Sequence, residues 1–320
     1  MGRRVNVSAA TRALVVAKPG MLTTVQDLGR VGYQTLGVPV AGPMDWYSHR
    51  LANRMLGNDP MAAALEVTLL GPELIAEGPV RCAMAGADID VHVDGRAVPR
   101  DAPFDVPPGA RIRFGARRAG ARLTLAVAGG FDLPLTFGSR STHVVSRMGP
   151  FGGRPLKAGD KLPVGAIGST ASPATAAAPL AMPAAGAVVR VVEGVHRNRF
   201  TDRAWQVLTS SRFVVTPQSN RMGYRLDGPS LEHLAGADIL SEATPIGALQ
   251  VPASGLPILL MADRQTTGGY TTIANVISAD LPVAGQLAPG DWISFEPCSY
   301  EEAIAALRAR LAAVGGETGV

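Results

Sequence analysis

The densest group of side chains capable of chemistry follows an apolar run, Pro257 to Met261, that we expect to be a strand. A strand that delivers a carboxylate, a guanidinium, an amide and hydroxyls into a Gly-Gly turn is typical of active-site loops. Asp263 is the first catalytic candidate, because a carboxylate in such polar surroundings can take a proton or hold Mg²⁺. The candidates for substrate binding in this region are Gln250, Arg264, Gln265, Thr266 and Tyr270.

A second polar cluster, residues 23–30, packs an amide, a carboxylate and a guanidinium beside a glycine. Asp27 and Arg30 are catalytic candidates, one for proton transfer and the other for stabilising negative charge. Gln26 is a candidate for binding the amide of a substrate. The alternative is a polar turn in which Asp27 pairs with Arg30, since Asp and Gly favour turns for purely structural reasons.

Two further turns contain arginine. Ser139 and Arg140 lie in a Gly-Ser-Arg-Ser-Thr segment that could cradle an anion or merely cap a loop, and Arg221 lies four residues before Arg225. Arginine matches the geometry of a carboxylate with two hydrogen bonds at once. We therefore expect Ser139, Arg140 and Arg221 to bind substrate, and the substrate to be a small amide-containing molecule with anionic character.

The basic residues exclude several classes of protein. Only three of the thirty are lysine, and none of these follows a glycine, which excludes a phosphate-binding P-loop. None lies in the Met-Lys-Met context of a biotin carrier, so we expect no covalently attached biotin. The arginines are dispersed without a basic, aromatic-rich patch, so we expect no nucleic-acid partner. The five histidines are scattered, and we expect no metal site.

The remaining compositional signals concern location. Cys82 and Cys298 fit no metal or redox spacing, which is typical of a reduced cytosolic protein. No apolar segment follows the basic N-terminus, so we expect no signal peptide. The longest uncharged stretch, between Lys161 and Arg190, contains four prolines and is better suited to a linker than to a membrane helix. These features predict a cytoplasmic protein that does not associate with membranes.

The elements that must position these side chains are mostly strands. The chain has 37 Gly and 25 Pro in 320 residues, which would interrupt a long helical bundle, while its 47% apolar content excludes a disordered chain. Short alternating runs bounded by turn residues predict a mainly β protein. The runs expected to be strands are 89–93 (before an Asp94-Gly95 hairpin turn), 112–114, 123–127, 207–215, 258–261 and 292–295.

Helices are expected at only two places. Apolar residues recur at helical spacing over 44–56, with Pro43 suited to the first turn and Gly57 as the stop. Near the C-terminus, Ser299 and Glu302 form a capping box that predicts a helix over 299–314.

Three short blocks occur twice in the same order, on either side of an Ala/Pro-rich linker expected at 166–187. The paired blocks are 69–74 with 226–231, 85–89 with 235–239, and 159–162 with 290–293. Such an ordered repeat indicates a duplicated domain. We expect an N-terminal domain over 14–165 and a C-terminal domain over 188–298, each a closed β-barrel.

The motifs taken together resemble one family. They include Thr-Val-Gln-Asp-Leu-Gly-Arg at 24–30, Gly-Ser-Arg-Ser-Thr at 138–142, Arg-Met-Gly-Tyr-Arg-Leu at 221–226 and Ala-Asp-Arg-Gln-Thr-Thr-Gly-Gly-Tyr at 262–270. The family is that of the biotin-dependent carboxyltransferases, which includes the C subunit of 5-oxoprolinase and is also labelled allophanate hydrolase subunit 2. The resemblance covers nearly all of residues 14–297. It implies two tandem cyclophilin-like β-barrel domains with a few helices.

The resemblance also implies an activity. In such a 5-oxoprolinase this chain would work with the A and B subunits to open 5-oxo-L-proline to L-glutamate, with ATP and Mg²⁺ bound mainly with the partner subunit. Because a lactam amide is inert, ATP would phosphorylate its oxygen before water attacks, and arginines would stabilise the developing negative charge. The family leaves two alternatives: carboxyl transfer from biotin to a urea-like amide, and a non-enzymatic regulator that binds a kinase-inhibitor homologue of the B subunit.

Two departures from the family pattern bear on the substrate. Asn220 stands where the family usually has aspartate, and residues 195–198, Val-His-Arg-Asn, replace a segment that tends to contain aspartate. Both departures remove a carboxylate from the C-terminal domain. The substrate of this protein could therefore differ from that of its relatives, or be more anionic.

Overall fold

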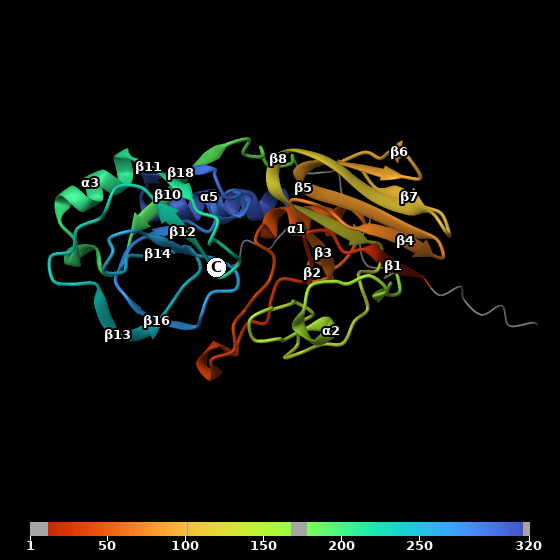
Figure 1. Cartoon of the computed structure of the whole chain (residues 1–320), viewed down its shortest axis with the longest axis horizontal. Helices are drawn as coiled ribbons and strands as arrows, with labels where there is room; N and C mark the ends of the chain where they lie inside the picture. The colour runs from red at the N-terminus through yellow and green to blue at the C-terminus, as the bar shows by residue number, and fades with distance from the viewer. Residues whose placement is uncertain (1–11, 101, 168–177, 316–320) are drawn as a thin grey trace, which may run out of the picture.

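The computed structural model describes residues 12–100, 102–167 and 178–315. The chain is mainly β, with few helices, and Figure 1 shows two β regions side by side. The helices are α1 (Trp46–Met55), α2 (Pro150–Gly153), α3 (Asp202–Ser210), α4 (Leu281–Ala284) and α5 (Tyr300–Ala313), with 3-10 turns η1 (Gln34–Leu36) and η2 (Arg197–Arg199). No helix among the described residues combines the length and the apolar character needed to cross a bilayer.

The first β region is a nine-stranded curled sheet and not the closed barrel that the sequence led us to expect. Its main path runs β2-β3-β8-β4-β1-β9, and the long strand β5 pairs with β6, β7 and β8. The expected Asp94-Gly95 turn joins β5 to β6, with positive φ at both turn residues. The strands are β1 (Ala13–Lys18), β2 (Leu22–Gln26), β3 (Ala64–Thr68), β4 (Glu73–Glu77), β5 (Val80–Val93), β6 (Arg96–Ala97), β7 (Phe104–Val106), β8 (Arg111–Val127) and β9 (Lys161–Pro163).

The second β region is a closed barrel of seven strands, in the order β10-β17-β14-β15-β12-β11-β18. A separate two-stranded ribbon, β13 with β16, projects from it at the lower edge of Figure 1. The strands are β10 (Gly186–Glu193), β11 (Arg212–Val215), β12 (Gly223–Asp227), β13 (Asp238–Ala243), β14 (Ala248–Gln250), β15 (Ile258–Leu260), β16 (Thr267–Tyr270), β17 (Thr272–Val276) and β18 (Trp292–Pro297).

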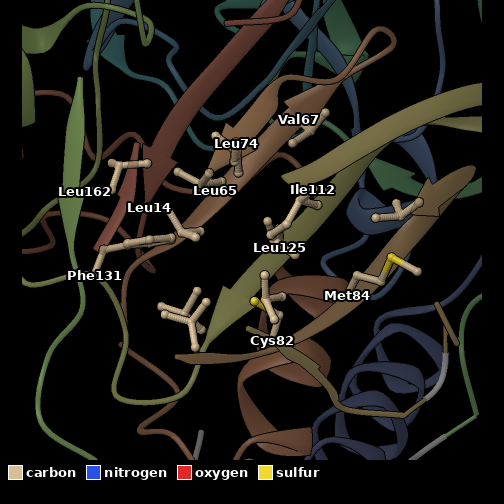
Figure 2. Packing of buried hydrophobic residues seen from close by; sticks show 14 of the residues in the cluster. Leu14, Leu65, Val67, Leu74, Cys82, Met84, Ile112, Leu125, Phe131 and Leu162 are labelled. Carbon is tan, nitrogen blue, oxygen red and sulfur yellow. The ribbon is translucent and has the colours of Figure 1, made fainter. Parts of the chain in front are cut away.

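Each β region has its own apolar core. In the first, Leu14, Leu65, Leu74 and Leu125 are wholly buried between strands that are far apart in sequence, and Figure 2 shows their side chains converging. The second core includes Phe213 and Phe295, whose ring centroids lie 5.9 Å apart inside the barrel. Separate cores give each region a rigid frame on which polar loops can be held in place.

The repeated blocks 159–162 and 290–293 make the same hydrogen bonds in the two regions. The backbone amide of Gly159 donates to the Val16 carbonyl, and that of Gly290 donates to the Val215 carbonyl, both at 2.8 Å. The Val16 amide donates back to the Asp160 carbonyl, as the Val215 amide does to the Asp291 carbonyl, both at 2.9 Å. By contrast, the repeated blocks 85–89 and 235–239 differ in secondary structure. Residues 85–89 lie within β5, whereas 235–239 lead into β13.

Three sequence expectations about elements were wrong. Residues 207–210 belong to helix α3, which begins at a Thr201 cap, so only 212–215 form a strand. Pro43 lies outside α1, whose N-cap is Asp45. The two strands expected at 112–114 and 123–127 are one continuous strand, β8. The capping box of Ser299 and Glu302 is confirmed at the start of α5.

Candidate functional site

A buried charged cluster joins the two β regions. Arg221 forms a two-point ion pair with Asp263, with Nε to Oδ2 and Nη2 to Oδ1 both at 2.9 Å. Its Nη1 also donates to Glu66 on β3 of the first region, and its Nη2 donates to the Gly42 carbonyl at 2.6 Å. Burial opposes the charge of Arg221, but the carboxylates of Asp263 and Glu66 outweigh burial and raise its pKa. Arg221 is therefore permanently charged.

The chain positions this cluster with short, well-determined segments. Asp263 closely follows β15, and its amide donates to the Arg221 carbonyl at 2.8 Å. Glu66 also accepts from the amide of Met44 at 2.7 Å, which ties the loop before α1 to the cluster. His143 Nδ1 accepts from the Ser146 amide, so its Nε2 donates to the Asp263 carbonyl at 3.2 Å. Asp263 is thus fixed from both regions.

Asp27 lies at the centre of a second buried network. Its Oδ1 accepts from the hydroxyls of Ser139 and Ser141 at 2.6 Å each, and from the Gly29 amide at 2.9 Å. Its Oδ2 accepts from the Arg140 amide at 2.5 Å. The carboxylate therefore holds the 138–142 loop against the end of β2, and Ser139 is one of its donors.

The guanidinium of Arg30 lies next to this network without an ion pair among the described residues. Its Nη2 donates to the Ser141 carbonyl and its Nε to the Thr136 carbonyl at 3.4 Å, while Nη1 is buried without a hydrogen-bond partner among those residues. Burial lowers the pKa of Arg30, although the carboxylates of Asp27 and Asp263 act in the opposite direction. Arg30 thus lies in the electrostatic field of both catalytic candidates.

The other predicted residues of the first region are also held internally. Gln26 Nε2 donates to Thr24 Oγ1 at 2.9 Å and to the Thr142 carbonyl at 3.1 Å. Arg140 Nε donates to the Leu133 carbonyl at 2.6 Å, and its Nη2 pairs with Asp132 at 3.0 Å. The structure therefore places Gln26 beside the 138–142 loop, which contains Ser139 and Arg140 and which Asp27 holds.

A cavity of about 280 Å³ opens at the junction of the two regions, and we call it the junction cavity. It is lined by Gln34, Val40, Ala243, Thr244, Pro245, Arg264, Gln265 and Thr266. Arg264 Nε donates to the Thr244 carbonyl at 2.9 Å, and burial lowers the pKa of Arg264. No ion pair among the described residues involves Arg264, so its guanidinium is available to an anion.

A second cavity, of about 210 Å³, shares Gln265 with the first. We call it the amide-lined cavity. Its lining consists of Gln218, Asn220, Met222, Gly223, Arg225, Gln250, Ile258, Leu260, Gln265 and Tyr270. The predicted residues Gln250, Gln265 and Tyr270 meet here, while Arg264, Gln265 and Thr266 meet in the junction cavity.

The model of the carboxyltransferase domain, subdomain A and B, matches residues 36–297. This chain belongs to that carboxyltransferase family. The family domain therefore includes both cavities and the Arg221 cluster, apart from Gln34. The structural resemblance agrees: the urea carboxylase of Kluyveromyces lactis superposes with a TM-score of 0.90 at 31% identity, over 98% of this chain and 30% of that one.

Curated relatives of this chain include C subunits of 5-oxoprolinase and a much longer urea amidolyase. The C subunit of 5-oxoprolinase from Escherichia coli is 38% identical over 92% of this chain and 94% of its own length. The corresponding protein of Haemophilus influenzae is 36% identical over 88% and 89%. The urea amidolyase of Lachancea kluyveri is 34% identical over 91% of this chain, which spans only 17% of that longer protein.

Sequence reasoning missed several residues that the structure brings to the candidate site. Glu66 is one, although a lone carboxylate within the apolar strand 64–68 was an available signal. Arg225 also lines the amide-lined cavity, although its spacing from Arg221 and its place in the 221–226 motif were available signals, whereas no local pattern distinguishes Gln218 from surface residues. A larger cavity, of about 400 Å³, lies between α1, β5 and residues 179–182 and contains none of the predicted residues.

Proposed function

We propose that this chain is the C subunit of an ATP-dependent 5-oxoprolinase, a cytoplasmic hydrolase that opens 5-oxo-L-proline to L-glutamate together with the A and B subunits. The observation that carries the proposal is the end-to-end match to the C subunit of Escherichia coli, over 92% of this chain and 94% of that protein. The urea amidolyase of Lachancea kluyveri, by contrast, is matched over only 17% of its length.

The side chains available at the junction suit a role in stabilising charge. Attack on an activated lactam builds negative charge on the carbonyl oxygen, and a fixed guanidinium in a low-dielectric site stabilises such charge. Arg264 is held by Thr244 and has no carboxylate partner among the described residues. Asp263 accepts two hydrogen bonds from Arg221, so its carboxylate balances the charge of that buried guanidinium.

The described residues offer no cluster of ligands to the metal ion that accompanies ATP. Arg264 offers a guanidinium to an anion, whereas these residues contain no group of three or more His, Cys, Asp or Glu side chains placed to hold a metal. We therefore propose that ATP and Mg²⁺ are bound mainly with the partner subunit. This chain then contributes substrate binding and charge stabilisation, with no biotin attached to it.

The test is reconstitution. The chain is co-expressed with candidate A and B subunits, and release of glutamate from 5-oxo-L-proline is measured with and without ATP. ATP-dependent release that needs all three chains supports the proposal. Complexes that assemble and bind ATP but release no glutamate would refute it.

Carboxyl transfer is the second candidate, and the TM-score of 0.90 with the urea carboxylase of Kluyveromyces lactis favours it. In that case the chain would move a carboxyl group from carboxybiotin on a separate carrier to an amide nitrogen. Incubation with a carboxylated biotin carrier and urea distinguishes the two functions. Loss of carboxybiotin with formation of a carboxylated urea would support carboxyl transfer, and stable carboxybiotin would exclude it.

A further inference from the structure

The amide-lined cavity lies on the outer side of the second barrel. Gly223 and Arg225 of β12 and Ile258 of β15 form part of its wall, and β12 pairs directly with β15. Tyr270, at the end of β16, also lines it. The cavity is therefore bounded by the rigid barrel on one side and by the projecting ribbon on the other, two elements whose arrangement is visible in Figure 1.

The lining has an unusual chemical character. It includes four primary amides, from Gln218, Asn220, Gln250 and Gln265, and it includes no carboxylate among the described residues. Each primary amide offers two donors and a carbonyl acceptor, which is the set that pairs with another amide. Gln250 is only 3% exposed, yet its Nε2 makes just a long contact, 3.5 Å from the Tyr270 carbonyl. Its amide is thus available to a ligand.

Arg225 supplies the charge of this cavity. Its backbone closes the turn before β12, where its amide donates to Ser219 Oγ at 3.0 Å. Its side chain is exposed, and no ion pair among the described residues involves it. Leu260, which is almost fully buried, and Ile258 add apolar surface beside this charge. The cavity thus combines one cation, several amides and a small apolar wall.

We propose that the amide-lined cavity binds a small carboxylate that also carries an amide or lactam group. Arg225 binds the carboxylate, Gln250 and Gln265 bind the amide, and Ile258 and Leu260 contact the methylene groups. The volume of about 210 Å³ limits the ligand to a small molecule. The identification of this ligand as 5-oxo-L-proline rests on the proposed function.

Arg225 provides the test of the charge argument. Arg225→Met removes the guanidinium and keeps an unbranched side chain. We expect Arg225→Met to weaken binding of 5-oxo-L-proline at least ~10-fold, because the carboxylate of the ligand loses its cation. Arg203→Met, at an exposed position on α3, is the matched control.

Binding is measured by titration calorimetry on the assembled complex without ATP, and thermal unfolding checks that each variant is folded. Pyrrolidin-2-one, which lacks the carboxylate, should bind Arg225→Met and the unaltered complex equally. The proposal is overturned if 5-oxo-L-proline does not bind the unaltered complex, or if folded Arg225→Met binds it within twofold of the unaltered protein.

The glutamate-release assay separates this proposal from the proposed function. A complex that releases glutamate with an unchanged KM in the Arg225→Met variant would refute the cavity assignment and leave the function standing. A complex that binds 5-oxo-L-proline through Arg225 but releases no glutamate with ATP would refute the function and leave the cavity assignment standing.

Discussion

Arg221 and Asp263 form a two-point ion pair whose side chains are only 6% and 4% exposed. The pair lies within the second region, but a further contact of Arg221 reaches Glu66 in the first. Removing one member of a buried ion pair is costly, because the remaining charge has lost its compensation. The Arg221 cluster therefore holds the two regions together.

The first prediction concerns Asp263→Ala. We expect it to lower the free energy of unfolding by about 3 kcal/mol, since Arg221 stays buried with only Glu66 to compensate it. Chemical denaturation measures this effect. Asp132→Ala, which removes the partly exposed partner of Arg140, is the control and should cost about 1 kcal/mol or less. Equal effects of the two substitutions would contradict the structural role of Asp263.

The second prediction concerns Asp27→Ala. Four donors lose their acceptor, including the amides of Gly29 and Arg140. Each buried donor left unsatisfied costs about 1–3 kcal/mol, so we expect faster hydrogen exchange throughout residues 138–142 and lower stability. The exchange of β11 amides, in the barrel of the second region, should not change. Unaltered exchange at 138–142 would show that Asp27 does not hold this loop.

The third prediction concerns pH. Burial lowers the pKa of His49 to about 4, and the carboxylate of Asp27 only partly offsets this effect. The unfolded chain takes up a proton near pH ~6.5 that the folded chain excludes, so stability is complete above that pH and is lost as the pH falls toward ~4. The contribution is about 3 kcal/mol, at about 1.4 kcal/mol per pKa unit.

His49→Gln is the variant that isolates this effect. It removes the titrating group and leaves an acceptor for Asn53, whose Nδ2 lies 3.2 Å from His49 Nε2. The free energy of unfolding is measured by denaturation between about pH 4 and 7, the range set by the folded and unfolded pKa values. The difference between the two proteins should change with pH only in this range. A constant difference would contradict the lowered pKa.

The fourth prediction concerns Gln286, which bridges the two regions through its side-chain amide. Its Oε1 accepts from the amides of Ala121 and Arg122 at 3.0 and 2.9 Å. Its Nε2 donates to Asp45 Oδ2 at 2.6 Å and to the Arg122 carbonyl at 2.8 Å. Gln286→Leu should therefore cost about 3 kcal/mol, whereas Gln206→Leu on the surface of α3 should cost little. Thermal unfolding compares the two variants, and similar midpoints would contradict the bridging role.

The fold could be predicted where the signal was local. The Asp94-Gly95 turn and the Ser299–Glu302 capping box each depend on neighbouring residues alone, and both are present. The failure at α3 has a physical reason: Val207 favours a strand, but the Thr201 cap and the burial of Ala204 and Leu208 on one face stabilise a helix. Tertiary packing overrode the local preference.

The candidate site was less predictable, because its contacts join distant residues. The polar loop after β15 was evident in the sequence, but the pairing of Asp263 with Arg221 spans 42 residues, and that of Arg221 with Glu66 spans 155. Ser139, a partner of Asp27, lies 112 residues away from it. Residue type alone could not separate side chains that hold the regions together from those, such as Gln250, that line a cavity.

The two turns at Asp160 and Asp291, which make the same hydrogen bonds in the two regions, have a consequence for the history of the chain. If both halves descend from one ancestral barrel, their junction corresponds to the interface of a symmetric dimer of that ancestor. Two-fold symmetry would have placed identical residues on both sides of such an interface. Fusion into one chain releases that constraint, so an ion pair such as that of Glu66 with Arg221 needs to form only once across the junction.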